Sequence, residues 1–237
     1  MKPGTLHVVG VGPGDPELLT LKAVRVIAAA PVIAYCAKRG EPGHARSIAA
    51  GHFRPDAQEV RLDFPLTTER MPADPAYRAA LAGFYAEAAQ SLAARLDTGL
   101  NVALLCEGDP LLYGSSIPLI ERLSGYRIVL IPGVAGMSGA WAAACTPMVR
   151  GDGVLTVMPG TLPEDTLAAR LEGRDAAVIL KLGRNLPKVR AALTRAGRAA
   201  GAVYVERGTM AGERVLPFSA VNGASAPYFS LVLVPAA

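Results

Sequence analysis

The sequence predicts an α/β protein built from two α/β domains, and three observations carry that prediction. Segments with strand patterns alternate with segments of helical periodicity, which is typical of a largely parallel sheet. Strong helical periodicity is missing between Thr209 and Pro227, which favours mixed pairing among the last strands. Three strand patterns also run into glycine- and proline-rich turns: HVVGVGPGDP (7–16), VALLCEGDPLLYG (102–114) and IVLIPGVAG (128–136). We therefore expect a domain over 1–132 with a mainly parallel sheet, a domain over 133–237 with a mixed sheet, and an interdomain cleft.

The expected elements follow from these patterns. In the first half, the strands are expected at 7–11, 31–36, 101–106 and 126–131. The helices there are expected at 16–30, at 76–97 and from about Ser116. A small-residue helix over 133–145 is expected to cross to the second half and to act as a hinge. Four further strands are expected at 154–158, 176–182, 202–206 and 228–234, with a hairpin-like piece at 206–218. Two helices are expected between them, one opened by a capping box, Thr161 with Glu164, and one from about Asn185.

The first turn differs from the dinucleotide-binding fingerprint. Gly10, Gly12 and Gly14 let the backbone approach a ligand, but Asp15 stands where the third fingerprint glycine would fall. The next strand pattern ends at 37–39 without an acidic residue for a ribose hydroxyl, which disfavours NAD. No GK[ST] follows the glycines, so a P-loop is excluded. We expect Asp15 to cap the following helix and the turn to bind a ligand.

Composition bounds the class of protein. The chain has 237 residues, 51% of them hydrophobic, but its longest apolar run is too short to span a bilayer. The amino terminus enters a strand at once and lacks a secretory signal, so a cytoplasmic location is expected. Neither a disulfide framework nor a metal site is indicated, because the cysteines and histidines are few and widely spaced. They are Cys36, Cys106, Cys145, His7, His44 and His52.

The net charge of +4 does not indicate nucleic-acid binding. Lysines and arginines are scattered and aromatic residues reach only 5%, so no aromatic and basic platform for bases is present. The surplus positive charge fits an acidic small molecule better.

Five segments together resemble the tetrapyrrole (precorrin) methyltransferase family. They are VVGVGPGDPELLTLKA, CEGDPLLYGSS, LIPGVAGMSGA, LKLGRNLPKVRAAL and YVERGTMAGERV, and the likeness covers nearly the whole chain. The last two segments are most similar to the branch that methylates C-20 of precorrin-2, giving precorrin-3A in cobalamin biosynthesis. The resemblance implies a homodimer of two-domain subunits that bind S-adenosylmethionine in the interdomain cleft and release S-adenosylhomocysteine.

The resemblance also implies which residues meet the cofactor. They are Pro13, Glu107, Gly108, Asp109, Ser115, Ala135, Gly136, Lys181, Leu182, Gly183, Gly208 and Thr209. Transfer of an activated methyl group needs positioning more than acid catalysis, which suits glycine-rich loops. The acceptor carbon must lose a proton, and Asp109 and Tyr113 are the candidate catalytic residues for that step.

The implied substrate carries eight carboxylate side arms, so cationic side chains are expected to bind it. The candidates are Lys38, Arg46, Arg150 and Arg184, each expected in a loop or at the end of an element. Two alternatives stay open: methylation of a cobalt-bearing acceptor or another ring position, and a non-catalytic nucleotide-binding module.

Overall fold

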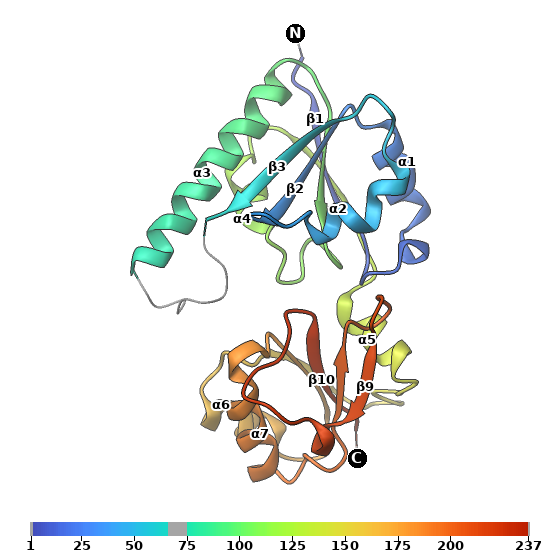
Figure 1. Ribbon diagram of the computed structural model, residues 1–237, viewed down its shortest axis with the longest axis vertical. Coiled ribbons are helices and arrows are strands. Elements are labelled where there is room, and N and C mark those ends of the chain that lie inside the picture. The colour runs from blue at the N-terminus through green and yellow to red at the C-terminus, as the bar shows by residue number, and fades with distance from the viewer. Residues whose placement is uncertain (1, 66–74, 237) are drawn as a thin grey trace. The chain divides into compact units, whose positions relative to one another are not determined.

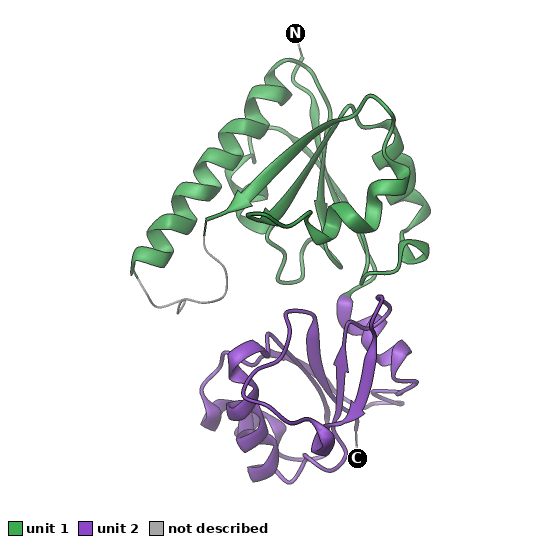
Figure 2. Ribbon diagram, viewed as in Figure 1, with its two compact units in different colours: residues 1–135 green, residues 136–237 purple. Residues whose placement is uncertain are grey.

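The computed structural model describes residues 2–65 and 75–236, and the chain divides into two compact units. Unit 1 comprises residues 1–135 and unit 2 residues 136–237 (Figure 2). The sequence places the boundary between 132 and 133, in the same loop but slightly earlier.

Unit 1 contains a five-stranded sheet in the order β3-β2-β4-β1-β5, and every pair of neighbouring strands is parallel (Figure 1). The strands are β1 (Thr5–Gly10), β2 (Val32–Lys38), β3 (Gln58–Phe64), β4 (Val102–Cys106) and β5 (Arg127–Ile131). The helices are η1 (Pro16–Leu18), α1 (Leu21–Ala29), α2 (His44–Ala49), η2 (Ala50–His52), α3 (Pro75–Asp97) and α4 (Ile117–Arg122). The prediction of a mainly parallel first sheet is confirmed.

Helices cover both faces of this sheet because alternate strand residues point to opposite sides. Leu6 and Val8 of β1 pack in the cluster that contains α3 and α4. Val9 packs in the cluster on the opposite face, with α1 and α2. Helix α3, expected at 76–97, buries one face in the first of these clusters at Phe84, Tyr85, Ala88, Leu92 and Leu96. This two-sided burial fixes all five strands and leaves their carboxyl ends at one edge.

Three predictions for unit 1 need correction. The single helix expected at 16–30 is a 3-10 turn followed by α1, because Thr20 accepts a hydrogen bond from Ala23 N–H and starts a new helix. The sequence analysis also missed α2 and β3. Strand β3 alternates charged residues with Val60, Leu62 and Phe64, which is the ordinary pattern of a half-buried strand and could have been found.

Unit 2 contains a mixed sheet in the order β6-β7-β10-β8-β9. Strands β6 and β7 are parallel, whereas β10 is antiparallel to β7 and β8, and β8 to β9. The strands are β6 (Leu155–Pro159), β7 (Ala176–Leu180), β8 (Val203–Glu206), β9 (Arg214–Pro217) and β10 (Ser230–Val234). The helices are α5 (Gly136–Ala143), α6 (Glu164–Leu171), η3 (Gly183–Asn185), α7 (Leu186–Arg195) and η4 (Phe218–Ala220). The predicted mixed sheet and hairpin are confirmed.

Helices α6 and α7 pack on one face of the second sheet and α5 packs on the other. The predicted capping box is wrong, since Pro163 occupies the N-cap position of α6 and no side chain caps it. Strand β7 ends at Leu180, so the residues after it form a loop and a 3-10 turn.

Candidate functional site

Three glycines meet at the carboxyl edge of the parallel sheet in unit 1. Gly10 ends β1, Gly108 follows β4, and Gly133 follows β5. A Cβ atom on Gly10 would lie 2.6 Å from the Gly108 carbonyl oxygen and 2.6 Å from the Gly133 nitrogen. The backbones therefore leave no room for a side chain at Gly10 or Gly133, which explains why the first and third turns need glycine there.

Hydrogen bonds tie the first turn to the second. Gly108 N–H donates to the Gly12 carbonyl at 2.8 Å, and Val11 N–H donates to the Cys106 carbonyl at 2.9 Å. Gly12 and Gly108 have φ values of 80° and 64°, which side-chain-bearing residues seldom adopt. Pro13 is buried beside Gly12. The two loops thus form one rigid layer.

Asp109 fastens this layer to the third turn. One carboxylate oxygen accepts the N–H of Leu111 at 2.9 Å, and the other accepts the N–H of Gly133 at 3.2 Å. Both oxygens are therefore engaged by backbone donors, and Asp109 holds the loops after β4 and β5 together. Asp15 likewise accepts from Glu17 N–H at 2.9 Å and caps η1, as predicted.

Glu107 caps a helix from a distance. Its Oε1 accepts the N–H of Ala45 at 3.2 Å, in the first turn of α2. The N-cap residue of α2 is Gly43, which has no side chain for this purpose. Glu107 therefore holds α2 against the second loop, a role that the sequence analysis did not anticipate.

The remainder of the second loop presents apolar side chains. Leu111, Leu112 and Tyr113 are 55%, 37% and 46% exposed. Below them, Ser116 donates to the Pro110 carbonyl at 2.9 Å and is itself buried. Ser115, just before it, is only half-buried. The loop is anchored at its base, while its tip offers an apolar surface.

In unit 2, the predicted residues after β7 and β8 lie at a single edge. Both strands run antiparallel to β10 and so point the same way. Lys181, Leu182 and Gly183 follow β7, and Gly208 and Thr209 follow β8. The sheet topology therefore brings together two segments that are separated in the sequence.

The backbone is strained in the loops predicted to bind ligands. Of the described residues, five other than glycine have positive φ, and four of these lie in the loops after β4, β7 and β8. They are Tyr113 (56°), Lys181 (56°), Arg207 (51°) and Thr209 (67°). Such conformations cost about 1–3 kcal/mol each and are concentrated at functional sites.

Thr209 also has an unsatisfied hydroxyl. Its Oγ1 is buried without a hydrogen-bond partner, while its N–H donates to Glu213 at 2.7 Å. The adjacent Gly208 lies against α5, because a Cβ there would be 3.1 Å from the Ala140 Cα. A buried orphan hydroxyl beside close-packed backbone fits a polar ligand such as a nucleoside. Ala135 and Gly136 lie at the start of α5.

Glu206 supports this loop and was not predicted. Its side chain is only 7% exposed, and Oε2 accepts from the Tyr204 hydroxyl at 3.1 Å and from Arg214 at 3.3 Å. Burial, together with the hydrogen bond to Glu206, raises the pKa of Tyr204 to about 12. Glu206 also lies 3.8 Å from Arg207, so it fixes the start of the strained loop. The sequence did offer a signal for the role of Glu206, because an acidic residue stands at the end of an apolar strand pattern.

The four cationic candidates differ in their surroundings. Arg46 makes two 2.8 Å hydrogen bonds to Glu59, and these hold the pKa of Glu59 below its usual value. Its guanidinium is therefore neutralised within the protein, which disfavours the predicted substrate role. Lys38 is exposed at the carboxyl end of β2, and Arg184 is exposed in η3, directly after the Lys181 loop.

Arg150 lies at the wrong edge of its sheet for the predicted site of unit 2. It precedes β6, which runs parallel to β7, whereas Lys181 follows β7. The five residues of β7 span about 16 Å at 3.3 Å per residue, so the two side chains start from opposite ends of the sheet.

Residues 2–65 and 75–236 lack two kinds of feature. They contain no group of three or more His, Cys, Asp or Glu side chains that could hold a metal ion. None of their helices is long and apolar enough to cross a membrane.

Comparisons with known proteins point to one family. The family model for Tetrapyrrole (Corrin/Porphyrin) Methylases matches residues 5–221. The chain is 49% identical to a Sinorhizobium protein named precorrin-2 C(20)-methyltransferase, covering 98% of this chain and 95% of that one. It is 28% identical to the cobalt-precorrin-2 C(20)-methyltransferase of Salmonella typhimurium, covering 98% and 96%.

A solved structure shares the fold. The uroporphyrin-III C-methyltransferase of Thermus thermophilus, complexed with S-adenosylhomocysteine, aligns with a TM-score of 0.66 at 22% identity. The alignment covers 98% of this chain and 92% of that one. The match to the family model over most of the chain, together with the 49% identical relative, identifies the chain as a member of the tetrapyrrole (corrin/porphyrin) methylase family.

Proposed function

We propose that this enzyme transfers a methyl group from S-adenosylmethionine to C-20 of precorrin-2, giving precorrin-3A in cobalamin biosynthesis. The observation that carries the proposal is the 49% identity, over 98% of the chain, to the Sinorhizobium protein named for that reaction. In the transfer, a carbon–sulfur bond breaks, a carbon–carbon bond forms and C-20 loses one proton.

The residues of each unit fit S-adenosylmethionine, which supplies an activated methyl group when bound. In unit 1, the close-packed backbones of Gly10, Gly108 and Gly133 keep side chains out of the edge where a ligand would lie. In unit 2, the orphan Thr209 hydroxyl can donate a hydrogen bond to a polar group of the ligand. The proposed binding residues are Pro13, Glu107, Gly108, Asp109, Ser115, Ala135 and Gly136, followed by Lys181, Leu182, Gly183, Gly208 and Thr209.

Within this set, Glu107 and Asp109 would hold the backbone of the ligand-binding loops in place. Their carboxylates are held by Ala45 N–H and by Leu111 and Gly133 N–H, so they fix backbone rather than reach outward. Tyr113 stands on the exposed tip of the same loop. Its hydroxyl could take the C-20 proton only while passing its own proton to solvent, whereas the Asp109 carboxylate could accept the proton directly, so we propose both residues as candidates for this step.

Arg184 is our first choice for binding the substrate carboxylates, with Lys38 as the second. Both are exposed at the carboxyl edges of their sheets, where the ligand-binding loops lie. Arg46 is engaged by Glu59 and Arg150 lies at the other edge of its sheet, so we give them no part in this proposal.

We also propose that units 1 and 2 correspond to two folding domains, and that the protein is a cytoplasmic homodimer. The composition supports the dimer, since 51% of residues are hydrophobic and only 19% are charged, which suits a chain that buries apolar surface in a subunit contact. Light scattering tests the dimer, which should have twice the mass of the 24.6 kDa chain.

A second candidate substrate is precorrin-2 that already carries cobalt. The 28% identity to the Salmonella protein named for that acceptor supports it, but less strongly than the 49% identity supports the metal-free one.

The decisive experiment supplies methyl-labelled S-adenosylmethionine with either metal-free or cobalt-loaded precorrin-2, and locates the label by carbon NMR. Label at C-20 of the metal-free acceptor is the expected result. Preference for the cobalt-loaded acceptor would favour the second candidate, and label at another carbon would overturn the assignment of C-20. Binding of S-adenosylhomocysteine without any transfer would favour a non-catalytic module.

A further inference from the structure

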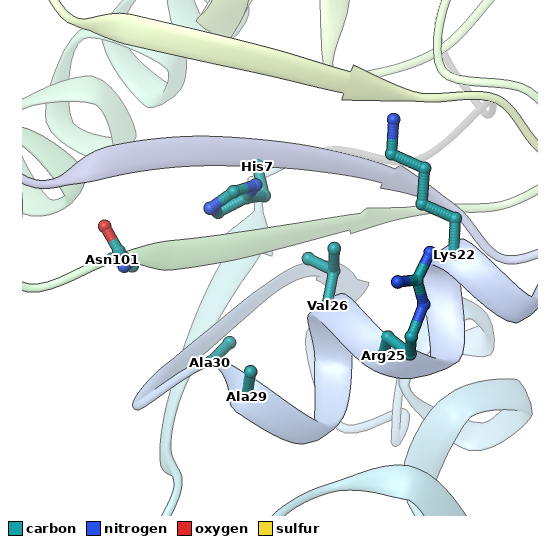
Figure 3. A pocket seen from close by; sticks show the side chains of 7 residues that line it. All are labelled: His7, Lys22, Arg25, Val26, Ala29, Ala30 and Asn101. Atoms are coloured by element: carbon teal, nitrogen blue, oxygen red, sulfur yellow. The ribbon is translucent and has the colours of Figure 1, made fainter.

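Unit 1 also has a cavity whose lining does not include the glycine turns. It has a volume of about 250 Å³ and opens beside α1 (Figure 3). Its lining residues come from β1, from α1 and from the residue before β4: His7, Lys22, Arg25, Val26, Ala29, Ala30 and Asn101. His7 lies three residues before Gly10, which corresponds to about 10 Å along the strand. None of its lining residues belongs to the candidate site.

The cavity gathers positive charge without a counter-charge. Lys22 and Arg25 project from one helix, and Arg127 of β5 is close enough to influence His7. No aspartate or glutamate lines the cavity. Within residues 2–65 and 75–236, none of these three cations forms an ion pair. Unpaired like charges that gather in a concavity favour a bound anion.

His7 adds an unsatisfied polar atom. Its Nδ1 is buried without a hydrogen-bond partner, which costs about 1–3 kcal/mol when nothing compensates it. Burial, followed by the charges of Arg127 and Lys22, lowers the pKa of His7, so the ring is neutral at pH 7. Asn101 accepts the N–H of Thr5 through Oδ1 at 2.8 Å, which leaves its amide NH₂ as a donor. Figure 3 shows His7 between Asn101 and the side chains of α1.

The rest of the lining is apolar. Val26, Ala29 and Ala30 form it, and they offer no acceptor or charge. The volume is about eight times the share of one water molecule in the liquid, about 30 Å³, so the cavity can hold several non-hydrogen atoms. A lining that combines cations, hydrogen-bond donors and methyl groups matches an anion with a short hydrocarbon body.

We propose that this cavity binds a small organic carboxylate, held by Lys22 and Arg25 and resting on Val26 and Ala29. The site is independent of the proposed methyl transfer, so failure of one leaves the other standing.

The test uses the whole protein with ¹⁵N-labelled histidine, and the probes are butyrate, formate and inorganic phosphate at constant ionic strength. The His7 ring signals are assigned with His7→Gln. We expect saturable shifts of these signals with butyrate, and weaker binding of formate, which has the same charge but no hydrocarbon body. We also expect the pKa of His7 to rise at saturation, because the bound carboxylate offsets the charges of Arg127 and Lys22 that lower it.

The matched variants separate this site from general charge effects. K22Q/R25Q should weaken butyrate binding by about tenfold or more, because two charge-assisted contacts are lost. R170Q/R174Q removes the same charge from exposed positions of unit 2 and should leave binding unchanged. R127Q removes the positive charge that β5 places near His7. It should raise the pKa of His7 even without a ligand.

His7 shifts that grow with butyrate concentration without saturating would overturn the proposal. An equal loss of butyrate binding in K22Q/R25Q and in R170Q/R174Q would overturn it too. Tighter binding of phosphate than of butyrate would overturn the choice of a carboxylate.

Discussion

The Asp109 carboxylate accepts the N–H of Gly133 at 3.2 Å and so joins the loop after β4 to the loop after β5. Strand β1 lies between these two strands in the sheet, and its last residue, Gly10, packs against both loops. One side chain thus closes a layer of three turns around the end of a central strand. In a methyltransferase, where positioning supplies most of the acceleration, the rigidity of such a layer bears directly on rate.

Replacing Asp109 with Asn should loosen this layer without unfolding the protein. The amide can still accept from Leu111, but its NH₂ would then face the N–H of Gly133, and one charge-assisted hydrogen bond is lost. We expect a loss of about 1–2 kcal/mol in the free energy of unfolding. Urea denaturation measures this loss as a lower midpoint at unchanged slope. An unchanged midpoint would show that the clamp does not stabilise the fold.

Gly10→Ala should be severe, because its Cβ would lie 2.6 Å from backbone atoms that cannot move independently. We expect a loss of about 3 kcal/mol or more, with loss of S-adenosylhomocysteine binding in any folded protein. Gly51→Ala is the matched control, since no atom lies within 4 Å of its added Cβ. Thermal unfolding compares the two variants, and similar melting temperatures would contradict the packing argument.

Thr209→Val keeps the shape of the side chain and removes the orphan hydroxyl. The free protein should be as stable as the parent or slightly more stable, because a buried polar atom without a partner is lost. Affinity for S-adenosylhomocysteine should fall by about two- to tenfold if the hydroxyl donates to the ligand. Calorimetric titration measures the affinity. Unchanged affinity would remove Thr209 from the proposed site.

Arg184→Ala should raise KM for the tetrapyrrole and leave cofactor affinity nearly unchanged. The expected loss is about 1.5–3 kcal/mol of substrate binding, and high salt should mimic part of it in the parent protein. Steady-state kinetics at several salt concentrations check this. A mutant that loses cofactor binding instead would place Arg184 at the nucleotide.

His7 should contribute to the loss of folding stability at acid pH. Because its pKa is lowered in the folded state, the unfolded chain binds its proton first as the pH falls. The contribution of His7 to stability is therefore fully present above about pH 6.5, the unfolded value, and decreases below it. His7→Gln should show a shallower decline in unfolding free energy below that pH. Parallel curves for parent and variant would contradict the lowered pKa.

The sequence by itself determined the elements that local pattern specifies. The apolar stripe of α3 appears in its three- and four-residue spacing, and the turn after β1 appears in GVGPGD, since few residues other than glycine tolerate its backbone conformation. The sequence motifs also identified the family. Strand β3 was missed although its alternation of charged and apolar residues is a strand pattern, and helix α2 was missed because it has only six residues and no side chain at its N-cap.

Only the tertiary structure decided which residues act together. The hydrogen bond of Asp109 to Gly133 and that of Glu107 to Ala45 join residues whose separation along the chain gives no hint of contact. It also decided that Arg46 is neutralised and that Arg150 lies at the opposite end of its sheet from Lys181. The physical reason is that sequence periodicity records which face of an element is buried, whereas strand order and register determine which loops meet at an edge.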